Sequence, residues 1–541
     1  MNYRMYMKNK TKLITIIILL FIIFFITFCF LFINNKENNT KSFKKDRVVY
    51  ALSLNGKSIS SFPSKGMYKV SVACENADGI WLYDKWKLAI DNIKGNVICD
   101  INFQSTTKTF FNDYITGLQG TEQGTGQVVN ETSKIPDWDN ASAIAKSYYT
   151  NQSSFSSTSY KNTSGTDVTG IFSFSNNMWS TKASAMSSGT YYNFMFNPKE
   201  DGYYKFCYVF SGGTYDDQIR AFLDTNSIEF GSSSYISGSS LEKGDCIDLG
   251  YITSSQYLRI VQKAANTSTV FSFNLKKVSN VESATSVRYE GKNPNNYVWF
   301  NNEYWRIIGV FNSETHGQSD KKLVKLIRSE VLDALCWDIY KKNDWNTASL
   351  KSLLNEIYYN AKDGTDSGNC VVNGTTVNCN YVKRGIQPGY RNMIANVTWY
   401  LGKISKEASS SEEYFGFERK KTSWDGYIGL MYPSDYGYSV LSSECDRSVF
   451  LNQYSSKKCS TLSWLYGKGD EWTLSGKAFD NSSSYGALES LYLTSGGYMF
   501  SGTTHSYILF RPTLYLDSSV FVYDGDGSLD NPYIILNTGQ F

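Results

Sequence analysis

Residues 13–33 read LITIIILLFIIFFITFCFLFI, an apolar run of 21 residues that contains no charge. At about 1.5 Å of rise per residue, a helix of this length spans the roughly 30 Å hydrocarbon core of a bilayer. A cleavable signal peptide is the alternative, but its apolar region would be shorter, roughly 7–15 residues, and a small-residue cleavage site would follow it. Asn34-Asn35-Lys36 follows instead. We therefore predict one uncleaved transmembrane anchor at 13–33.

The anchor divides the N-terminal part into a short head at 1–12 and a polar tether at 34–46. Basic residues flank the anchor on both sides. An N-terminal anchor with a short basic head usually leaves that head in the cytoplasm, and long domains cross the membrane largely regardless of flanking charge. We expect a single-pass protein of the cell membrane, with a cytoplasmic N-terminus and the bulk of the chain outside.

The composition favours sheets over helices in the region beyond the anchor. The chain has 541 residues, of which 16% are aromatic, and this length predicts three or four domains. Aromatic and β-branched side chains fit the pleated, half-buried surface of a sheet. The net charge of +3 is close to neutral for this length, so nothing in the composition indicates a nucleic-acid partner, and none is expected. We predict a mainly β fold.

Nine of the ten cysteines lie beyond the predicted anchor. Disulfides persist in oxidising compartments, which agrees with an exported region, although sequence alone leaves their connectivity open. Buried unpaired thiols are the alternative, and zinc is disfavoured because no C-x-x-C occurs. Cys336 is left over and is expected to be an accessible thiol. The candidate pairs are Cys74 with Cys99, Cys207 with Cys246, Cys370 with Cys379, and Cys445 with Cys459.

Two segments between the anchor and the middle of the chain differ in character. Residues 47–113 contain alternating stretches such as Tyr68–Val72, which predict a small β unit. Residues 114–166 contain the Gly-rich GTEQGTG stretch and a run of Ser, Thr, Asn and Tyr. Such a composition buries little apolar surface, so we expect an exposed linker.

Residues 167–278 contain short strand candidates separated by turn signals, which predicts a β-sandwich. The strand candidates are 191–196, 203–210, 218–223, 246–249, 257–262 and 270–275. The phrase from Glu200 to Phe206, followed by Ala221–Asp224, resembles the jelly-roll modules of bacterial surface proteins. That resemblance implies a sandwich fold, and modules of this shape often bind carbohydrate.

Residues 286–541 carry an ordered series of aromatic motifs. The series consists of GKNPNNYVWF (291–300), EYWRIIGV (303–310), WN (345–346), SLKSLLN (349–355), IGLMY (428–432), SDYGY (434–438), EWTL (471–474) and RPTLYL (511–516). It resembles the DUF6273-like domain of surface and secreted proteins in low-GC Gram-positive bacteria, and more remotely the C-type-lectin-like fold of formylglycine-generating enzymes. The resemblance implies an α+β C-terminal domain and no particular activity. In such proteins the first β unit runs through a GTGQVV-like stretch almost directly into this domain, so 136–282 is interpreted as an insertion.

The C-terminal region offers one candidate binding site. Arg306 and Arg511 lie in apolar strand patterns, where a guanidinium group is costly unless it is paired. We expect each to meet a carboxylate, with Asp435 and Glu471 as candidates. Aromatic faces beside fixed polar groups suit sugars and peptides. The residues predicted to line a pocket are Trp464, Tyr466, Glu471, Trp472 and Arg511.

No sequence motif indicates catalysis or a cofactor. The sequence contains no G-x-S-x-G, P-loop or H-E-x-x-H motif. His316 and His505 lie in polar stretches and are expected to be solvated loop residues. Asp524, Asp526 and Asp530 alternate with glycines, as calcium ligands can. However, Asp-Gly turns are expected between apolar strands, and the turn is the favoured interpretation.

These observations lead to three hypotheses about function. The first is a non-enzymatic surface protein that is anchored by 13–33 and binds a glycan or a host or matrix protein. The second is a surface hydrolase that acts on glycans, because a catalytic carboxylate pair is defined by spatial separation and not by sequence. The third is a passive structural component of the surface. We favour the first.

Overall fold

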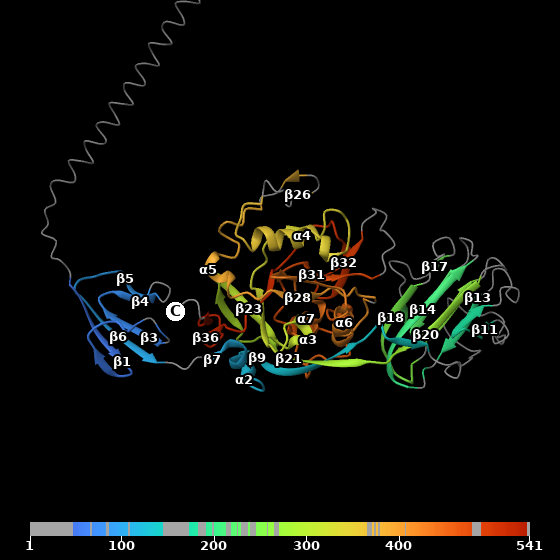
Figure 1. Ribbon diagram of the computed structural model, residues 1–541, viewed down its shortest axis with the longest axis horizontal. Helices are drawn as coiled ribbons and strands as arrows, with labels where there is room; N and C mark the ends of the chain where they lie inside the picture. Colours follow the sequence, from blue (N-terminus) through green and yellow to red (C-terminus); the bar gives the residue numbers. More distant parts are fainter. Residues whose placement is uncertain are drawn as a thin grey trace, which may run out of the picture. The chain divides into compact units, whose positions relative to one another are not determined.

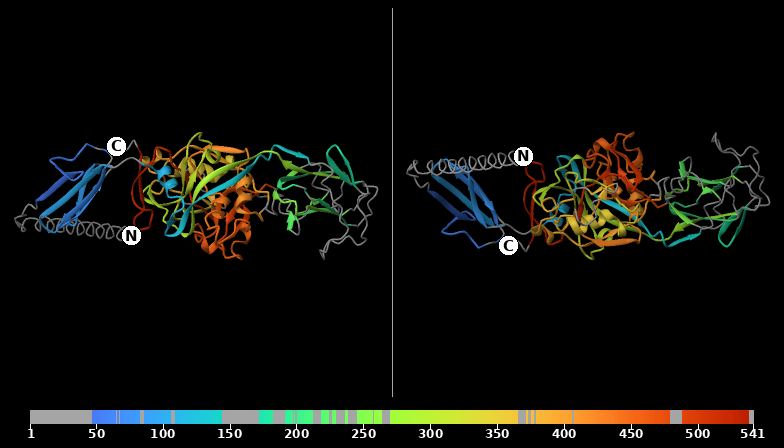
Figure 2. Two further views of the ribbon diagram at one scale, coloured as in Figure 1. Left: turned by 90° about the horizontal axis from the view of Figure 1, so that it is seen from below. Right: turned by 90° about the horizontal axis from the view of Figure 1, so that it is seen from above.

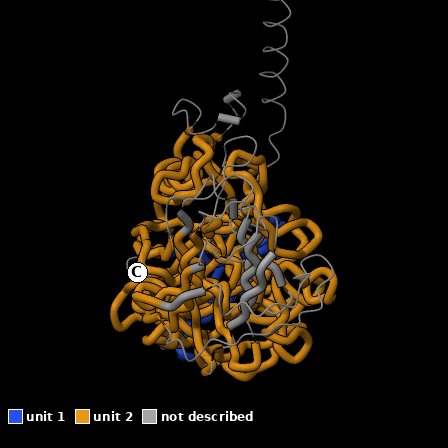
Figure 3. Tube along the Cα trace, turned by 90° about the vertical axis from the view of Figure 1, so that its right-hand side faces the viewer, with its two compact units in different colours: residues 1–107 blue, residues 108–541 orange. Residues whose placement is uncertain are grey.

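The computed structural model divides the chain into two compact units, Met1–Thr107 and Lys108–Phe541 (Figure 3). Both units are mainly β, as the composition predicted. The structure describes residues 47–64, 66, 68–82, 86–105, 109–143, 172–181, 191–196, 198, 200–211, 218–223, 226–228, 236–237, 245–256, 258–263, 270–364, 371–372, 375–376, 379–405, 407–478 and 488–537.

The predicted head, anchor and tether, residues 1–46, lie outside the described residues. Among the helices that the structure does describe, none is both long enough and apolar enough to cross a bilayer. The anchor at 13–33 therefore stays a prediction from sequence.

The first unit contains a four-stranded sheet with the order β2–β1–β6–β3 (Figure 1). Its strands are β1 (Val48–Leu54), β2 (Lys57–Ile59), β3 (Tyr68–Glu75) and β6 (Val97–Ser105), and a separate hairpin pairs β4 (Asp78–Leu82) with β5 (Lys87–Asp91). Alternate residues of β6 are buried, so one face of the sheet packs on the core that contains Trp81 and Phe103. Cys74 and Cys99 face each other across β3 and β6 and form a disulfide.

The first unit ends before the predicted boundary at residue 113. Thr109–Phe110 forms β7, which pairs with β36 (Phe521–Asp524) of the second unit. The following helix, α2 (Phe111–Gly117), buries Phe111 and Ile115 in the core of that unit. Residues 109–113 therefore belong to the second unit, because their apolar side chains pack there.

A sheet of eleven strands forms the framework of the second unit (Figure 1). Its central strand, β23, is buried from Trp305 to Phe311, as expected for a strand that is covered on both faces. The main path of the sheet is β30 (Ile428–Gly429), β35 (Thr513–Tyr515), β24 (Leu323–Arg328), β23 (Glu303–Phe311), β22 (Tyr297–Phe300), β37 (Tyr533–Leu536), β36 and β7.

The predicted linker at 114–166 is wrong for its first part. β8 (Glu122–Gln123) and β9 (Thr125–Pro136) form a hairpin within it. β9 then pairs along its whole length with β21 (Val281–Asn293), and β21 in turn pairs with β23. The Gly/Thr/Gln composition gave no sign of this strand, because the strand is stabilised by backbone pairing with a segment about 150 residues away in sequence. The low-complexity residues 144–166 lie outside the described residues.

The predicted insertion begins and ends at adjacent positions. Pro136 and Val281 are partners in the β9–β21 ladder, and the amide of Asp137 donates to the carbonyl oxygen of Asn280 at 2.9 Å. Just beyond them, β10 (Ala141–Ala143) pairs with β20 (Val270–Val278). Figure 2 shows β9 and β21 side by side as they lead into the central module. A segment whose two ends meet in this way can be inserted without disturbing the sheet that it leaves.

The central module has two antiparallel sheets, and six of its described strands match the six predicted candidates closely, whereas its shorter strands were not predicted. The first sheet has the order β11 (Phe172–Ser175), β12 (Met178–Thr181), β20, β14 (Gly202–Ser211) and β18 (Asp245–Ile252), with β10 on β20. The second contains β13 (Tyr191–Phe196), β19 (Leu258–Lys263), β15 (Gln218–Leu223), β16 (Asn226–Ile228) and β17 (Ile236–Ser237). Cys207 and Cys246 lie opposite each other on β14 and β18 and are joined.

A second sheet and several short helices complete the C-terminal region. The sheet has the order β25 (Ala334–Leu335), β34 (Ile508–Leu509), β31 (Glu471–Gly476), β32 (Glu489–Leu493) and β33 (Met499–Thr503). Two small hairpins are β26 (Val371–Val372) with β27 (Thr375–Thr376), and β28 (Val397–Tyr400) with β29 (Ser423–Gly426). The helical turns are α3 (Ser313–His316), η5 (Trp345–Thr347), α4 (Ser349–Ser352), η6 (Leu353–Tyr358), α5 (Pro388–Arg391), α6 (Ser411–Glu418), α7 (Pro433–Gly437), η8 (Leu451–Gln453) and η9 (Ser460–Leu462).

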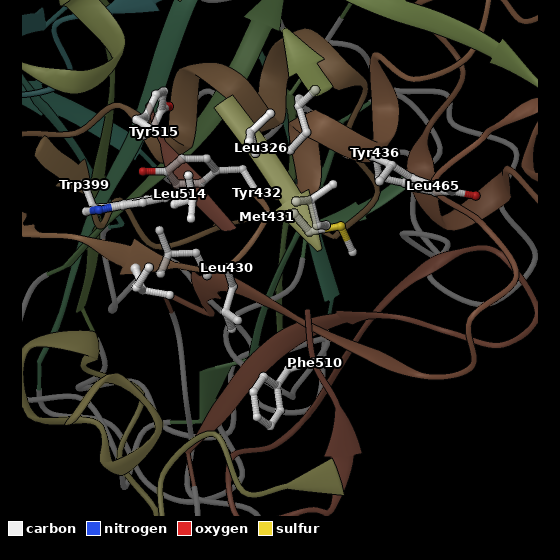
Figure 4. Close-up of a cluster of buried hydrophobic side chains, with 14 of the residues drawn as sticks. Leu326, Trp399, Leu430, Met431, Tyr432, Tyr436, Leu465, Phe510, Leu514 and Tyr515 are labelled. Atoms are coloured by element: carbon white, nitrogen blue, oxygen red, sulfur yellow. The ribbon is translucent and has the colours of Figure 1, made fainter. Parts of the chain in front are cut away.

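The core of the second unit lies between these elements (Figure 4). Leu326 of β24 and Leu514 of β35 meet Met431 and Tyr432, which precede α7. Cys445 and Cys459 close the loop around η8 by a disulfide. Cys379 is also disulfide-bonded, and its predicted partner Cys370 lies outside the described residues.

Candidate functional site: an aromatic pocket on one hairpin

The β22–β23 hairpin presents a different set of side chains on each of its faces. Val298, Phe300 and Trp305 are fully buried in the core. Between them, Trp299 is 38% exposed and Tyr304 is 37% exposed. Successive side chains of a strand point to opposite faces, so the hairpin holds the sheet with one face and leaves aromatic rings on the other.

The turn fixes which of these rings meet. Asn301 and Asn302 connect the strands with φ values of 57° and 60°, the conformation of the two-residue turn that matches strand twist. Asparagine tolerates positive φ better than most residues. As a result, Trp299 lies opposite Tyr304 and Tyr297 lies opposite Arg306.

The paired side chains form one continuous cluster. The Trp299 and Tyr304 rings are 5.1 Å apart, and the Tyr304 and Tyr297 rings are 6.1 Å apart, both edge to face. The Arg306 guanidinium lies 4.2 Å from the Tyr297 ring centre and 4.7 Å from that of Trp464. Trp464 therefore extends the cluster beyond the hairpin.

This cluster lines a pocket of about 480 Å³, which we call the aromatic pocket. Its size lies within the range of small-molecule sites. Its walls combine aromatic rings with charged groups, the composition that orients a polar ligand on an apolar surface. The lining residues are Tyr297, Trp299, Asn302, Glu303, Tyr304, Arg306, Arg328, Ser329, Glu330, Trp464, Lys468, Arg511 and Leu529.

Arg306 is held in the wall of the pocket by neutral partners. Its Nε donates to Oδ1 of Asn296 at 2.7 Å, and its Nη2 donates to Oδ1 of Asn293 and to the carbonyl oxygen of Pro294. The expectation that Arg306 meets a carboxylate is wrong for the described residues. Cation–π contact with two rings replaces the ion pair. Burial lowers the pKa of Arg306 to about 10, and the group stays charged at neutral pH.

The other charged groups of the pocket are engaged in ion pairs. Arg328 contacts Glu303 at 2.7 Å, and Lys468 contacts Glu330 at 2.7 Å. The predicted carboxylate partner of Arg511 is confirmed as Glu471, with Nε to Oε1 at 2.8 Å. Each of these three carboxylates therefore already has a cation as its partner within the fold.

The structure separates the five residues that were predicted to line a pocket together. Trp464 and Arg511 line the aromatic pocket. Glu471 is buried and holds Arg511. Trp472 is fully buried, and its indole nitrogen donates to the carbonyl oxygen of Leu335. The Tyr466 hydroxyl donates to the carbonyl oxygen of Ser495, and Tyr466 is absent from the lining of the aromatic pocket.

Sequence reasoning missed Tyr297, Trp299 and Tyr304 as pocket residues. The signal was nevertheless present, because tyrosine and tryptophan alternate with valine and phenylalanine on both sides of Asn301-Asn302. A two-residue turn between alternating segments predicts the hairpin, and the hairpin predicts which aromatic residues share a face.

The aspartate-rich loop between β36 and β37 forms a turn. The amide of Ser528 donates to Oδ1 of Asp526 at 2.9 Å, and the amide of Asp526 donates to the carbonyl oxygen of Asn531. Across the described part of the chain, no group of three or more His, Cys, Asp or Glu side chains is placed to hold a metal ion. The two hydrogen bonds of Asp526 form a turn of the kind that was predicted between the two apolar strands.

His316 is not the solvated loop residue that we expected. It ends α3, is fully buried and stacks edge to face on Tyr515. Its Nε2 bonds to the carbonyl oxygen of Phe311 at 3.1 Å, and its Nδ1 accepts from the amide of Gln318. Burial lowers the pKa of His316 to about 4. Both ring nitrogens are used within the fold, so this histidine is not a catalytic base.

Cys336 is unpaired, as expected, but it is buried and not accessible. Its thiol donates to the carbonyl oxygen of His505 at 2.9 Å. Burial raises the pKa of the Cys336 thiol to about 11. Because the thiolate is the nucleophile, we expect Cys336 to be unreactive at neutral pH in the folded protein.

Asp435 lies in a buried charge cluster away from the pocket. It contacts Lys325 at 2.5 Å and Arg288 at 3.3 Å, and all three side chains are almost completely buried. Burial favours the protonated acid, but the two cations outweigh it and hold the pKa of Asp435 below its usual value. Asp435 is therefore the partner of Lys325 and Arg288, and the suggestion that it pairs with Arg306 or Arg511 is wrong.

A larger cavity of about 730 Å³ lies between the central module and α6. Its lining includes Tyr203, Lys277, Glu412 and Arg447. The Tyr203 hydroxyl donates to Glu412 at 3.4 Å, Lys277 pairs with Glu200, and Arg447 pairs with Glu131 and Glu290. The aromatic pocket is the stronger candidate site, because its lining contains four aromatic rings, two of them tryptophan, together with Arg306, which has no carboxylate partner among the described residues.

The comparisons with known proteins add no family. No protein-family model matches the chain, and no curated protein matches it.

Proposed function

We propose that this chain is a membrane-anchored surface protein that binds a glycan in the aromatic pocket without chemical turnover. The observation that carries the proposal is the cross-strand arrangement of Tyr297, Trp299 and Tyr304, whose rings stand beside Arg306 and Trp464 in one pocket. Large aromatic side chains at a surface are costly to leave in water, and a cluster of them beside charged groups indicates a binding site.

A glycan fits these walls better than a purely apolar ligand. Pyranose rings have flat C–H faces that pack on aromatic rings, while their hydroxyls need hydrogen-bond partners at the edges. Asn302 and Ser329 line the pocket together with the charged groups. The pocket therefore offers both kinds of contact.

Binding without hydrolysis is favoured over the glycosidase hypothesis. A retaining or inverting glycosidase needs one carboxyl group with a raised pKa as general acid and a second as nucleophile or base. The carboxylates that line the pocket are Glu303 and Glu330, and each contacts a cation at 2.7 Å. This pairing supports a site that holds its ligand unchanged.

The proposal also covers the fold of the two modules and the location of the chain. We propose that the two sheets of the central module form a jelly-roll-like sandwich and that 286–541 is a DUF6273-like domain, remotely C-type-lectin-like. We also propose that the helix at 13–33 holds the chain in the membrane with both units outside. Three disulfides between described cysteines support an oxidising environment.

Full-length protein in detergent micelles tests the binding proposal on a glycan array, run beside a hydrolysis screen with the same glycans. We expect retention of at least one glycan class with no cleavage. Tyr304→Ala should weaken that binding about tenfold, corresponding to about 1.4 kcal/mol. Tyr340→Ala is the matched control, because Tyr340 is 70% exposed and lies outside the pocket lining.

The outcomes separate the three hypotheses. Cleavage that a single carboxylate substitution abolishes would establish the hydrolase. Neither binding nor cleavage would leave the passive structural component. Protease treatment of intact cells tests the location separately, and residues that stay uncut on intact cells but are cut after lysis would contradict an outward-facing chain.

A further inference from the structure

We infer that the glycan bound by the aromatic pocket is acidic, and that its anionic group, a carboxylate or a sulfate, sits against Arg306 and Arg511. This inference rests on the proposed function and adds the chemical class of the ligand. Its basis is the charge balance of the pocket and the hydrogen bonds that its guanidinium groups leave open.

The pocket has one cation more than it has carboxylates to neutralise. Four cations line it, and three of them are matched by one carboxylate each: Arg328 by Glu303, Lys468 by Glu330, and Arg511 by Glu471. Arg306 has no carboxylate partner among the described residues. The difference, 4 − 3, leaves one uncompensated positive charge in the wall of the pocket.

Arg306 is the residue that carries the surplus charge, and it is only 7% exposed. A buried guanidinium without an anion is costly, and the rings of Tyr297 and Trp464 offset only part of that cost. Burial is the main cause of the lowered pKa of Arg306, and the like charge of nearby Arg511 lowers this pKa further. An anionic ligand would supply the missing counter-charge.

The two guanidinium groups also have donors to offer. Nε and Nη2 of Arg306 are bonded to neutral oxygens, and Nε and Nη2 of Arg511 are bonded to Glu471 and to the carbonyl oxygen of Leu465. Within the described part of the chain, Nη1 of each group donates no hydrogen bond. Planar guanidinium groups match carboxylate and sulfate oxygens in both charge and geometry.

The sugar and its anionic group would occupy neighbouring parts of the pocket. The Tyr297 ring contacts both the Tyr304 ring and the Arg306 guanidinium group. A sugar ring that packs on the hairpin aromatics therefore places a substituent near Arg306. A phosphate or carboxylate without a sugar would leave Trp299 and Tyr304 unused, which is why we favour an acidic glycan over a small anion.

The first experiment uses a glycan array that contains neutral, uronic-acid, sialylated and sulfated glycans, probed with the full-length protein. We expect the retained glycans to be acidic. The carboxyl groups of a retained glycan are then reduced to alcohols, or its sulfates removed, and each treatment identifies the group that binds. Loss of the bound anion should weaken binding about 10- to 100-fold, as expected for charge-assisted hydrogen bonds.

The second experiment changes the protein. Arg306→Gln should weaken binding of the acidic glycan at least tenfold and change binding of its neutralised form less than threefold, because the two changes remove the same interaction. Arg384→Gln is the matched control, since Arg384 pairs with Asp333 outside the pocket, and it should leave both affinities unchanged. If Arg306→Gln does not fold, the affinities of the unchanged protein for the native and the neutralised glycan still test whether the bound group is an anion.

The outcomes distinguish this inference from the proposed function. Equal retention of neutral and acidic glycans would overturn the inference and leave glycan binding intact. Failure to retain any glycan would overturn the proposed function itself. Retention of acidic peptides in place of glycans would overturn both.

Discussion

Replacing Asp435 with asparagine should strongly destabilise the second unit. Asp435 faces Lys325 at 2.5 Å and Arg288 at 3.3 Å, and these side chains are at most 1% exposed. Because its pKa is held below the usual value, the carboxylate is ionised at neutral pH. Asparagine keeps the shape and removes the charge, so two cations lose their common counter-ion.

The expected loss is about 3–5 kcal/mol, the usual effect of removing one partner of a buried ion pair. At an effective dielectric constant of about 20, charges 2.5–3.3 Å apart attract by roughly 5–7 kcal/mol per pair. Two effects reduce this gross value. Burial already lowers the pKa of Lys325 to about 8, so the lysine can release its proton once Asp435 is neutral, and Arg288 keeps its contacts with the Phe311 and Tyr438 rings.

Urea denaturation of the full-length protein in micelles, followed by tryptophan fluorescence, measures this effect. Trp399 lies beside Lys325 and reports on the second unit. The control is Asp530→Asn, a substitution at an exposed loop position, which should change the free energy of unfolding by less than about 0.5 kcal/mol. The double variant Asp435→Asn with Lys325→Met should recover part of the lost stability. Methionine is uncharged and packs well against the aromatic rings that surround position 325. A change below about 1 kcal/mol for Asp435→Asn would refute the reasoning.

Three further predictions follow from buried or conformationally restricted residues. Burial lowers the pKa of His316 from 6.5 to about 4, so its stabilisation is complete above pH 6.5 and is lost as the pH falls towards 4. The loss in the free energy of unfolding amounts to about 3 kcal/mol, and His316→Gln should remove this pH dependence. If the free energy of unfolding, measured by denaturation, depends on pH in the same way in both proteins, the lowered pKa of His316 is contradicted. A Cys29→Ser background removes the cysteine of the predicted anchor. In this background and without reductant, Cys336 should react with a thiol reagent in the denatured protein but not in the native protein. Rapid labelling of the native protein would show that the thiol is accessible. Asn302 has a φ of 60°, so Asn302→Val should destabilise the hairpin by about 1–2 kcal/mol while Asn302→Gly should not, and equal unfolding free energies for the two variants would contradict the turn assignment.

Patterns of short range were sufficient to predict several parts of the structure. The alternation at Tyr68–Val72, which lies in β3, and the strand candidates of the central module were interpreted correctly, because the side-chain period of a strand is visible in a few residues. Three described cysteine pairs, Cys74–Cys99, Cys207–Cys246 and Cys445–Cys459, were also anticipated. The first two pairs lie at opposite positions of paired strands.

The candidate site was predicted only in part. Trp464 and Arg511 were identified because an aromatic face beside a fixed polar group suits a ligand, and because an arginine in an apolar strand pattern needs a partner. Trp472 has the same composition around it, yet its side chain faces the core. Which side of a strand meets solvent depends on what covers the sheet, and that covering comes from distant parts of the chain.

By itself, the sequence determined the β-rich character, the hairpin at Asn301-Asn302 and the apolar stretch at 13–33, because each depends on neighbouring residues alone. Only the tertiary structure decided that β9 pairs with β21, that Asp435 neutralises Lys325 and Arg288, and that Arg306 is left without a carboxylate. Pairing across more than a hundred residues is chosen by the packing of whole elements, and no local pattern records which of many possible carboxylates will lie within reach of a given cation.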